Sequence, residues 1–243
     1  MKFYYRLFLS LALFSASYVK ATHLSGGDIT YSCVGPNQYK IQIKLFRDCA
    51  GPAMGSSLQT LTFSNSCGLP DPSIILILQD PSTGTDCAGT VVSCATDISQ
   101  LCPAQMPFSS CNGGNLPGRQ EYIYSGTVTL PGLCDAWTID FNTPQRNPSV
   151  NVDGTPYFHL KTTMHTVSEP CNNSPVFTSQ PIPYVCINQP VNYNYGVVET
   201  DGDSMIFSLI NAMQSATAML LIMQATQAPC PFLALPLIPI QAN

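Results

Sequence analysis

The chain has 243 residues, enough for one large domain or two ordinary ones. Only 9% of the residues are charged, and the net charge of −5 excludes the basic surface that a nucleic-acid-binding protein needs. Because 45% of the residues are hydrophobic, the low charge indicates a packed core rather than disorder. The 21 prolines and 16 glycines favour turns and short strands, so we expect an all-β protein.

The N-terminus has the pattern of a secretory signal peptide. Lys2 and Arg6 are followed by an apolar run over residues 7–19, and Ala21 ends a stretch typical of a cleavage site. The alternative is a membrane anchor, but the run is shorter than the roughly 20 residues that span a bilayer, and Lys20 interrupts it. We therefore expect residues 1–21 to be removed, and a secreted or cell-surface protein without a membrane span.

Residues 22–170 are predicted to form a disulfide-rich antiparallel β domain. The chain has 11 cysteines, and in an exported protein this density is typical of disulfides. The absence of Cys-x-x-Cys spacings in the sequence makes zinc the weaker alternative. The spacing leaves the pairing open, and Cys230 makes the count odd. The ten candidates for five disulfides are Cys33, Cys49, Cys67, Cys87, Cys94, Cys102, Cys111, Cys134, Cys171 and Cys186.

Alternating apolar and polar residues predict the strands of this domain. Apolar residues at every second position over 39–45, preceded by a turn at 35–38, predict a hairpin with the segment 22–33. The continuous apolar run at 74–78 predicts a central strand, and residues 80–118 predict a long loop that needs cross-links. Further strands are expected at 58–63, 122–130, 136–141 and 157–163, with Trp137 in the core and no helical periodicity.

Six short motifs carry a resemblance to a known family. They occur at residues 23–31 (HLSGGDITY), 37–39 (NQY), 46–49 (FRDC), 111–114 (CNGG), 116–118 (LPG) and 122–128 (YIYSGTV). Together they resemble the N-terminal region of large exported surface proteins of Bacteroidetes. Those proteins are repetitive and often end in a gliding-motility-associated, type IX secretion sorting domain. The resemblance covers about residues 22–210 and implies a secreted module with neighbouring domains in a longer chain.

Residues 171–218 are predicted to begin a second β domain. The segment 172–177 (NNSPVF) resembles the linker that opens a cadherin-like domain, which is an immunoglobulin-like β-sandwich. From Pro175 to Asn243 the chain is shorter than the roughly 100 residues of such a sandwich, so we expect it to be incomplete. Residues 219–243 are apolar and rich in proline, and one hypothesis is that this tail is a product of a shifted reading frame.

An acidic turn in the second domain is a candidate calcium site, because calcium takes six to eight oxygen ligands. Cadherin-like linkers hold calcium between domains, and the resemblance implies the same here. The side chains that would supply oxygens are Glu199, Asp201, Asp203, Asn172, Asn173 and Glu169. The alternative is an ordinary turn, since Asp-Gly-Asp favours one without any metal. The spacing of an EF-hand is missing.

Motifs for catalysis are missing from the sequence, so we expect a protein that is not an enzyme. His159 and His165 could bind a metal, but we interpret them as solvated surface residues. The favoured function is a structural or adhesion module that contacts an extracellular protein or glycan surface. The alternative is a carbohydrate-binding accessory module of an extracellular hydrolase. Exposed rings of Tyr122 and Tyr124 would favour the alternative, and buried rings the adhesion module.

Overall fold

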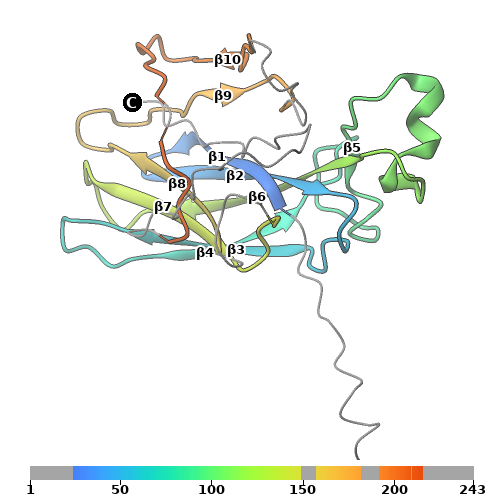
Figure 1. Cartoon of the computed structure of the whole chain (residues 1–243). Coiled ribbons are helices and arrows are strands. Elements are labelled where there is room, and N and C mark those ends of the chain that lie inside the picture. The colour runs from blue at the N-terminus through green and yellow to red at the C-terminus, as the bar shows by residue number, and fades with distance from the viewer. Residues whose placement is uncertain (1–23, 149–156, 182–191, 209, 216–243) are drawn as a thin grey trace, which may run out of the picture.

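The computed structural model describes residues 24–148, 157–181, 192–208 and 210–215. The fold is nearly all β, as the sequence predicts (Figure 1). The strands are β1 (Leu24–Gly35), β2 (Gln38–Asp48), β3 (Leu58–Ser64), β4 (Ser73–Leu78), β5 (Thr96–Asp97), β6 (Arg119–Thr129), β7 (Trp137–Thr143), β8 (Phe158–Met164), β9 (Val176–Phe177) and β10 (Val197–Val198). Two short 3₁₀ helices, η1 (Pro103–Phe108) and η2 (Ser110–Asn112), lie in the long loop before β6.

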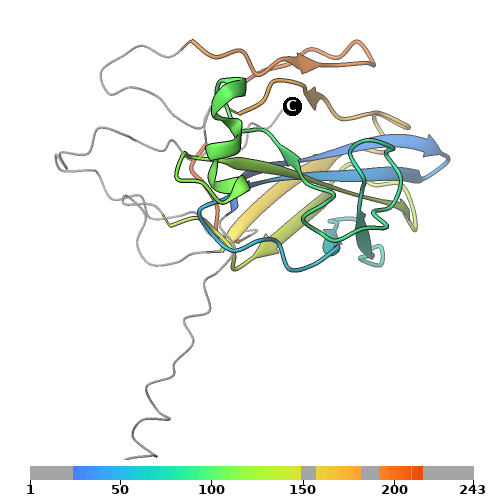
Figure 2. The ribbon, with the colours of Figure 1, turned by 90° about the vertical axis from the view of Figure 1, so that its right-hand side faces the viewer.

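Among the described residues, eight strands form one antiparallel sheet and β9 and β10 form a second. The order in the large sheet is β1-β2-β6-β4-β3-β7-β8, with β5 paired to β6. The first and last strands of this order, β1 and β8, come close enough that a Cβ at Gly27 would lie 3.0 Å from Leu160 Cδ1. The sheet is therefore nearly closed. The β9–β10 hairpin lies beside β1, away from β3 and β4 (Figures 1 and 2).

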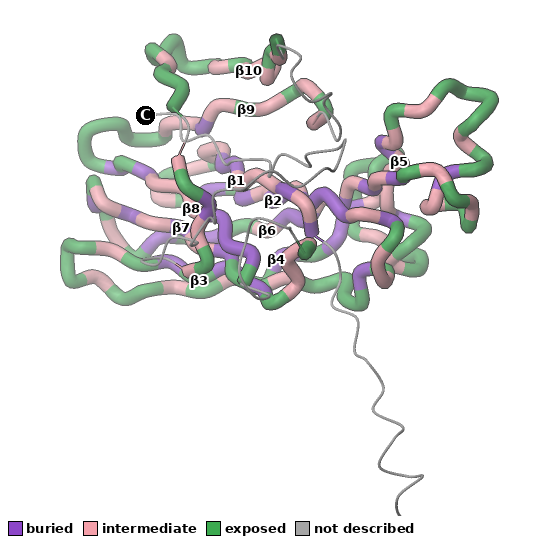
Figure 3. Tube along the Cα trace, in the orientation of Figure 1, coloured by how far each residue is buried: buried purple, intermediate pink, exposed green. Residues whose placement is uncertain are grey.

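The core fills the interior of the curved sheet, because every second side chain of a strand points inward. Buried residues accordingly recur along the strands of the large sheet (Figure 3). Trp137, Ile139 and Phe141 alternate inward on β7 and are buried, so the predicted place of the only tryptophan is confirmed. On β2, Ile41 and Ile43 are fully buried by the same alternation. The largest fully buried side chains are Trp137, Tyr122, Tyr124, Phe141, Leu24, Ile41, Ile43, Leu45, Leu61, Leu76, Leu78 and Ile139.

The predicted N-terminal hairpin is confirmed as β1 and β2, and two local features set its register. Asn37 closes the turn with φ of 55°, in the left-handed region that asparagine tolerates better than most residues. A register shift between Cys33 and Gly35 then places Asp28 opposite Lys44. Such a shift by one residue decides which face of the sheet the side chains of β1 between the shift and Gly26 point to.

One sequence interpretation of burial is wrong and one prediction of strand position is confirmed. The strand β4 is central in the sheet order, as predicted, although Ile75 is 61% exposed because only the inner face of β4 is covered. His159 is buried rather than solvated, and its Nε2 lies 3.1 Å from Asp140 Oδ1 on the neighbouring strand β7. His165, by contrast, is exposed in the loop after β8. Alternation along one strand shows which residues share a face, but it does not show what covers that face.

Eight of the ten predicted disulfide cysteines are paired in the structure. The bonds are Cys33–Cys171, Cys49–Cys111, Cys67–Cys134 and Cys87–Cys94. Cys102 is exposed and has no disulfide partner among the described residues. Cys186 and Cys230 lie outside the described residues, as does the tail at 219–243, so a fifth disulfide and the shifted-frame hypothesis stay predictions.

A buried guanidinium group orders the chain after β2. Arg47 donates from Nε to Pro52 O (2.6 Å) and from Nη1 to Gln120 Oε1 (2.6 Å). Its Nη2 donates to Gly51 O, and Tyr122 Oη donates to the same Gln120 Oε1 at 3.0 Å. A buried charged group needs such partners, because an unsatisfied one is costly. The loop 49–52 is therefore held against the start of β6.

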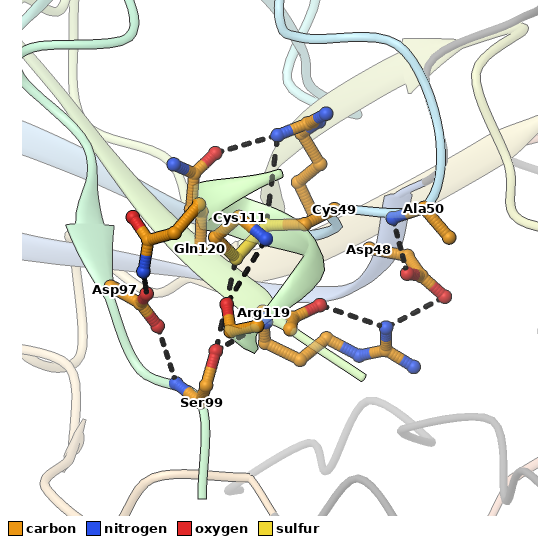
Figure 4. The surroundings of a disulfide bond; sticks show 12 residues. Asp48, Cys49, Ala50, Asp97, Ser99, Cys111, Arg119 and Gln120 are labelled. Atoms are coloured by element: carbon orange, nitrogen blue, oxygen red, sulfur yellow. Dashed lines mark hydrogen bonds and ion pairs between the residues drawn. A yellow bond between two sulfur atoms is a disulfide. The ribbon is translucent and has the colours of Figure 1, made fainter. Parts of the chain in front are cut away.

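The long loop before β6 is anchored beside this group (Figure 4). The Cys49–Cys111 disulfide joins the chain after β2 to η2. Arg119 Nη1 forms an ion pair with Asp48 Oδ2 at 2.6 Å, and the Arg119 backbone N donates to Ser99 Oγ at 3.0 Å. The cross-links predicted for residues 80–118 are present as this bond and as Cys87–Cys94.

A pair of alanine substitutions in β4 tests the placement of the core. Leu76 is fully buried and its neighbour Ile75 is mostly exposed. We expect Leu76→Ala to lower the free energy of unfolding by about 2–5 kcal/mol, because it leaves a cavity. The matched control Ile75→Ala should change it by less than about 0.5 kcal/mol. Urea denaturation measures both values, and equal effects would contradict the described inner and outer faces of β4.

The disulfides should differ in their contribution to stability. The loop closed by Cys33–Cys171 spans 138 residues and that closed by Cys87–Cys94 spans 7. In the chain-entropy model these loops correspond to about 5 and about 2 kcal/mol. We therefore expect the double alanine variant of the first pair to lose clearly more free energy of unfolding, measured in urea, than that of the second. The reverse order would argue against the assigned pairing, which peptide mapping without reduction tests directly.

Candidate functional site

The acidic turn predicted from the sequence is present and is closed by one carboxylate. Glu199 accepts hydrogen bonds from the backbone N–H groups of Asp201 (2.9 Å), Gly202 (2.5 Å) and Asp203 (2.8 Å). Gly202 has a φ of 88°, a conformation in which glycine is not strained. These backbone bonds, led by that of Asp201, hold the pKa of Glu199 below its usual value.

The structure brings the predicted calcium ligands together, but as partners of one another. The Asn173 side-chain and backbone nitrogens donate to Asp201 at 2.9 and 2.6 Å, and Asn172 Nδ2 donates to Asp203 Oδ2 at 3.2 Å. The amide groups thus present N–H, whereas calcium requires oxygen. In the described ranges, no group of three or more His, Cys, Asp or Glu residues is arranged to hold a metal ion. Glu169 is exposed, and calcium binding stays a prediction from the sequence.

A cleft of about 150 Å³ lies where the large sheet fails to close. The edge strand β8 forms one wall over residues 160–163. The opposite side is covered by the segment 174–181 together with Tyr193 and Tyr195, which we call the roof. In Figures 1 and 2 the β9–β10 hairpin, to which the roof belongs, runs alongside β1. Three parts of the chain that are distant in sequence therefore enclose one space.

The cleft follows the part of β1 whose outer edge is not paired with any other segment that the structure describes. At one end of β1, Leu24 N donates to Gln145 O at 2.8 Å. At the other end, Ser174 N donates to Tyr31 O at 2.9 Å, and Tyr31 N donates to Ser174 Oγ at 2.8 Å. Residues 27–29, between these two paired ends, line the cleft. The pairing at Tyr31 also holds the roof at a fixed distance from β1.

The floor of the cleft carries charged side chains on the outer face of β1, β2 and β6. Asp28 and Lys44 are direct cross-strand partners, and Glu121 lies on the adjacent strand. Lys44 Nζ donates to Phe177 O of the roof at 3.2 Å. Lys161 of β8 adds a second basic group to the lining. Two acidic and two basic side chains therefore share the cleft.

Asp28 is the least satisfied of these groups. Its Oδ1 atom is buried and has no hydrogen-bond partner among the described residues. Burial raises the pKa of Asp28 to about 6, and the nearby charge of Lys44 opposes this rise only in part. Burial raises the pKa of Glu121 as well, again against Lys44. Perturbed carboxyl groups in a cleft are typical of functional sites.

Aromatic rings form one side of the roof. The rings of Tyr193 and Tyr195 are 4.8 Å apart between centroids, and those of Phe177 and Tyr195 are 6.4 Å apart, both edge to face. Tyr193 Oη donates to Gln180 O at 2.6 Å, which ties the two halves of the roof together. The cleft thus combines apolar ring surface with carboxyl and ammonium groups, the mixture usual in ligand sites.

The cleft has no clear signal in the sequence. Asp28 lies within the predicted hairpin and Glu121 directly precedes the strand predicted at 122–130, and isolated acidic residues of this kind are usually solvated. The predicted hairpin alone could not have located it, because Asp28 lies opposite Lys44 only through the register shift between Cys33 and Gly35. The roof residues gave no signal, since their contact with β1 joins positions more than 140 residues apart.

Comparisons with known proteins identify no relative of this chain. No protein-family model matches it, and neither the curated proteins nor the solved structures include a significant match. Within the described ranges, no helix has the length and apolar character needed to cross a bilayer. The function must therefore be argued from the site.

The acidic turn should loosen at low pH. The pKa values of Glu199 and Asp201 are lowered, chiefly by backbone N–H donors, from reference values of 4.5 and 3.8. A lowered pKa means stabilisation that is complete above the reference value and is lost as the pH falls through the folded value. We expect the protection factors of the 201–203 amides to fall between about pH 6 and about pH 3.

Amide hydrogen exchange followed by NMR measures these protection factors. The control Glu199→Gln keeps an acceptor oxygen but removes the titrating group, so its protection should depend less on pH. Protection that stays constant in the native protein across the same pH range would contradict the role given to Glu199.

Proposed function

We propose that this chain is a non-catalytic binding module of a secreted or cell-surface protein, joined to neighbouring domains in a longer chain. The observation that carries the proposal is the cleft between β1, β8 and the roof. The Cys33–Cys171 bond attaches the start of the roof segment to β1. Binding sites that are largely formed in advance lose less free energy to ordering when a ligand arrives.

The disulfides support the extracellular location. Four are formed by the described cysteines, and such bonds persist in oxidising compartments outside the cytosol. The predicted signal peptide at 1–21 and the resemblance to Bacteroidetes surface proteins are independent sequence arguments for the same location. Together they support an exported module, with gliding-motility-associated or type IX secretion proteins as its proposed context.

The burial of two tyrosines favours a scaffold over an aromatic platform. Tyr122 and Tyr124 are both fully buried in the core, so neither ring is available to stack on a glycan. Tyr124 Oη donates inward to Ser56 O at 2.9 Å. Buried rings are the result expected for an adhesion module, so this observation favours that function over the carbohydrate-binding alternative. Any ligand site must lie elsewhere on the fold.

Binding of the chain to extracellular polymers and to cells tests the proposal. Beads coated with the purified, oxidised chain would be incubated with cellulose, chitin, xylan, peptidoglycan and collagen, and with intact Bacteroidetes cells. We expect at least one of these to be retained several-fold above albumin-coated beads, with no release of cleavage products. Beads coated with the reduced and alkylated chain serve as the matched control.

Retention that is lost after reduction would support a folded binding module. If the beads retain none of these materials, the proposal is overturned. Release of soluble fragments from a polymer would instead indicate an enzymatic function.

A further inference from the structure

We propose that the cleft binds a single ring of a neutral saccharide, with its hydroxyl groups on the floor and one face against the roof. This inference deepens the proposed function, on which it rests, by naming the ligand class. It is carried by four features of the described residues: an unsatisfied acceptor, balanced charges, an aromatic side and a small volume.

The unsatisfied acceptor favours a ligand that donates hydrogen bonds. Asp28 Oδ1 is buried and has no hydrogen-bond partner among the described residues, although buried polar atoms are nearly always paired. Glu121 places a second carboxyl group in the same lining. A hydroxyl group that reached Asp28 would form a hydrogen bond to a charged acceptor, which is stronger than one between neutral groups.

The charges of the cleft favour a neutral ligand over an ion. Lys44 acts on both carboxyl groups, since its charge opposes the rise in the pKa of Asp28 and of Glu121. An ammonium group that approached Asp28 would therefore meet the charge of Lys44, and a carboxylate or phosphate would meet Asp28 and Glu121. A polyhydroxylated ring avoids both conflicts, because each hydroxyl donates to a carboxylate and accepts from an ammonium group.

The remaining features fit one ring and its C–H face. Tyr193, Tyr195 and Phe177 lie on the roof side of the lining, and Thr162 and Thr163 lie on the β8 side. The volume of about 150 Å³ is below the roughly 300 Å³ at which pockets begin to enclose drug-sized molecules. One unit of a longer glycan is therefore the size of group that we expect to enter.

Direct titration of the oxidised chain tests the inference. The probes are the methyl glycosides of glucose, galactose, mannose and N-acetylglucosamine with their linear tetrasaccharides, and Nα-acetyl-lysine methylamide as the cationic comparison. Isothermal titration calorimetry and saturation-transfer NMR detect binding. We expect at least one saccharide to bind and the lysine derivative to show no binding.

Two variants locate the site. Asp28→Asn has nearly the same shape but loses the charged acceptor, and we expect it to weaken saccharide binding by about tenfold or more. Its thermal midpoint at pH 7 should equal or exceed that of the unchanged chain, which separates lost binding from lost folding. The matched control Asp71→Asn changes an exposed carboxyl outside the cleft lining and should bind as the unchanged chain does.

Three results would overturn the inference: binding of no saccharide in the set, equal binding by Asp28→Asn, or binding of the lysine derivative in place of sugars. If the coated beads still retain cells or a polymer in any of these cases, the proposed module function stands and only the ligand class is wrong.

Discussion

The attachment of residues 171–174 to the edge of β1 is the constraint on which the site depends. Cys171 is bonded to Cys33, and Ser174 exchanges two hydrogen bonds with the Tyr31 backbone. This contact satisfies edge groups that would otherwise be open to another strand. It also fixes the start of the roof, because Phe177 follows three residues later and accepts from Lys44 on the floor. One covalent bond and a few backbone contacts thus create a cleft beside the edge of β1.

The strands of the large sheet could be predicted from the sequence because each has its own local signal. The alternation over 39–45 reports a half-covered strand, and the turn at Pro36 and Asn37 joins it to β1. Trp137 was correctly placed in the core by the same alternation. No local pattern in the sequence shows which other segment covers the outer face of a strand. His159 was therefore interpreted as solvated and is buried, and the exposure of Ile75 on a central strand could not be predicted.

The candidate site could be predicted only in part, for two physical reasons. The acidic turn at 199–203 is local and could be predicted from composition. The approach of Asn173 to Asp201 joins positions 28 residues apart and was expected only from the resemblance to a cadherin-like linker, and the bonds formed are between amide and carboxylate. The floor of the cleft depends on the register shift near Cys33. Without that shift, each residue of β1 would face the opposite side of the sheet, and Asp28 would point into the core. The sequence has no clear pattern for a bulge of this kind.

Asp28 shows how the requirements of folding and of binding conflict in this cleft. Its reference pKa is 3.8 and burial raises the folded value to about 6, so the native state loses stability as the pH rises through this interval. At neutral pH the carboxylate is ionised and lacks a hydrogen bond at Oδ1 among the described residues, which a purely structural position would avoid. Lys44 offsets the penalty in part, but its ammonium group also donates to Phe177 O. A ligand hydroxyl at Oδ1 would supply the missing partner, so the group that weakens the free fold is the one that would gain most from binding.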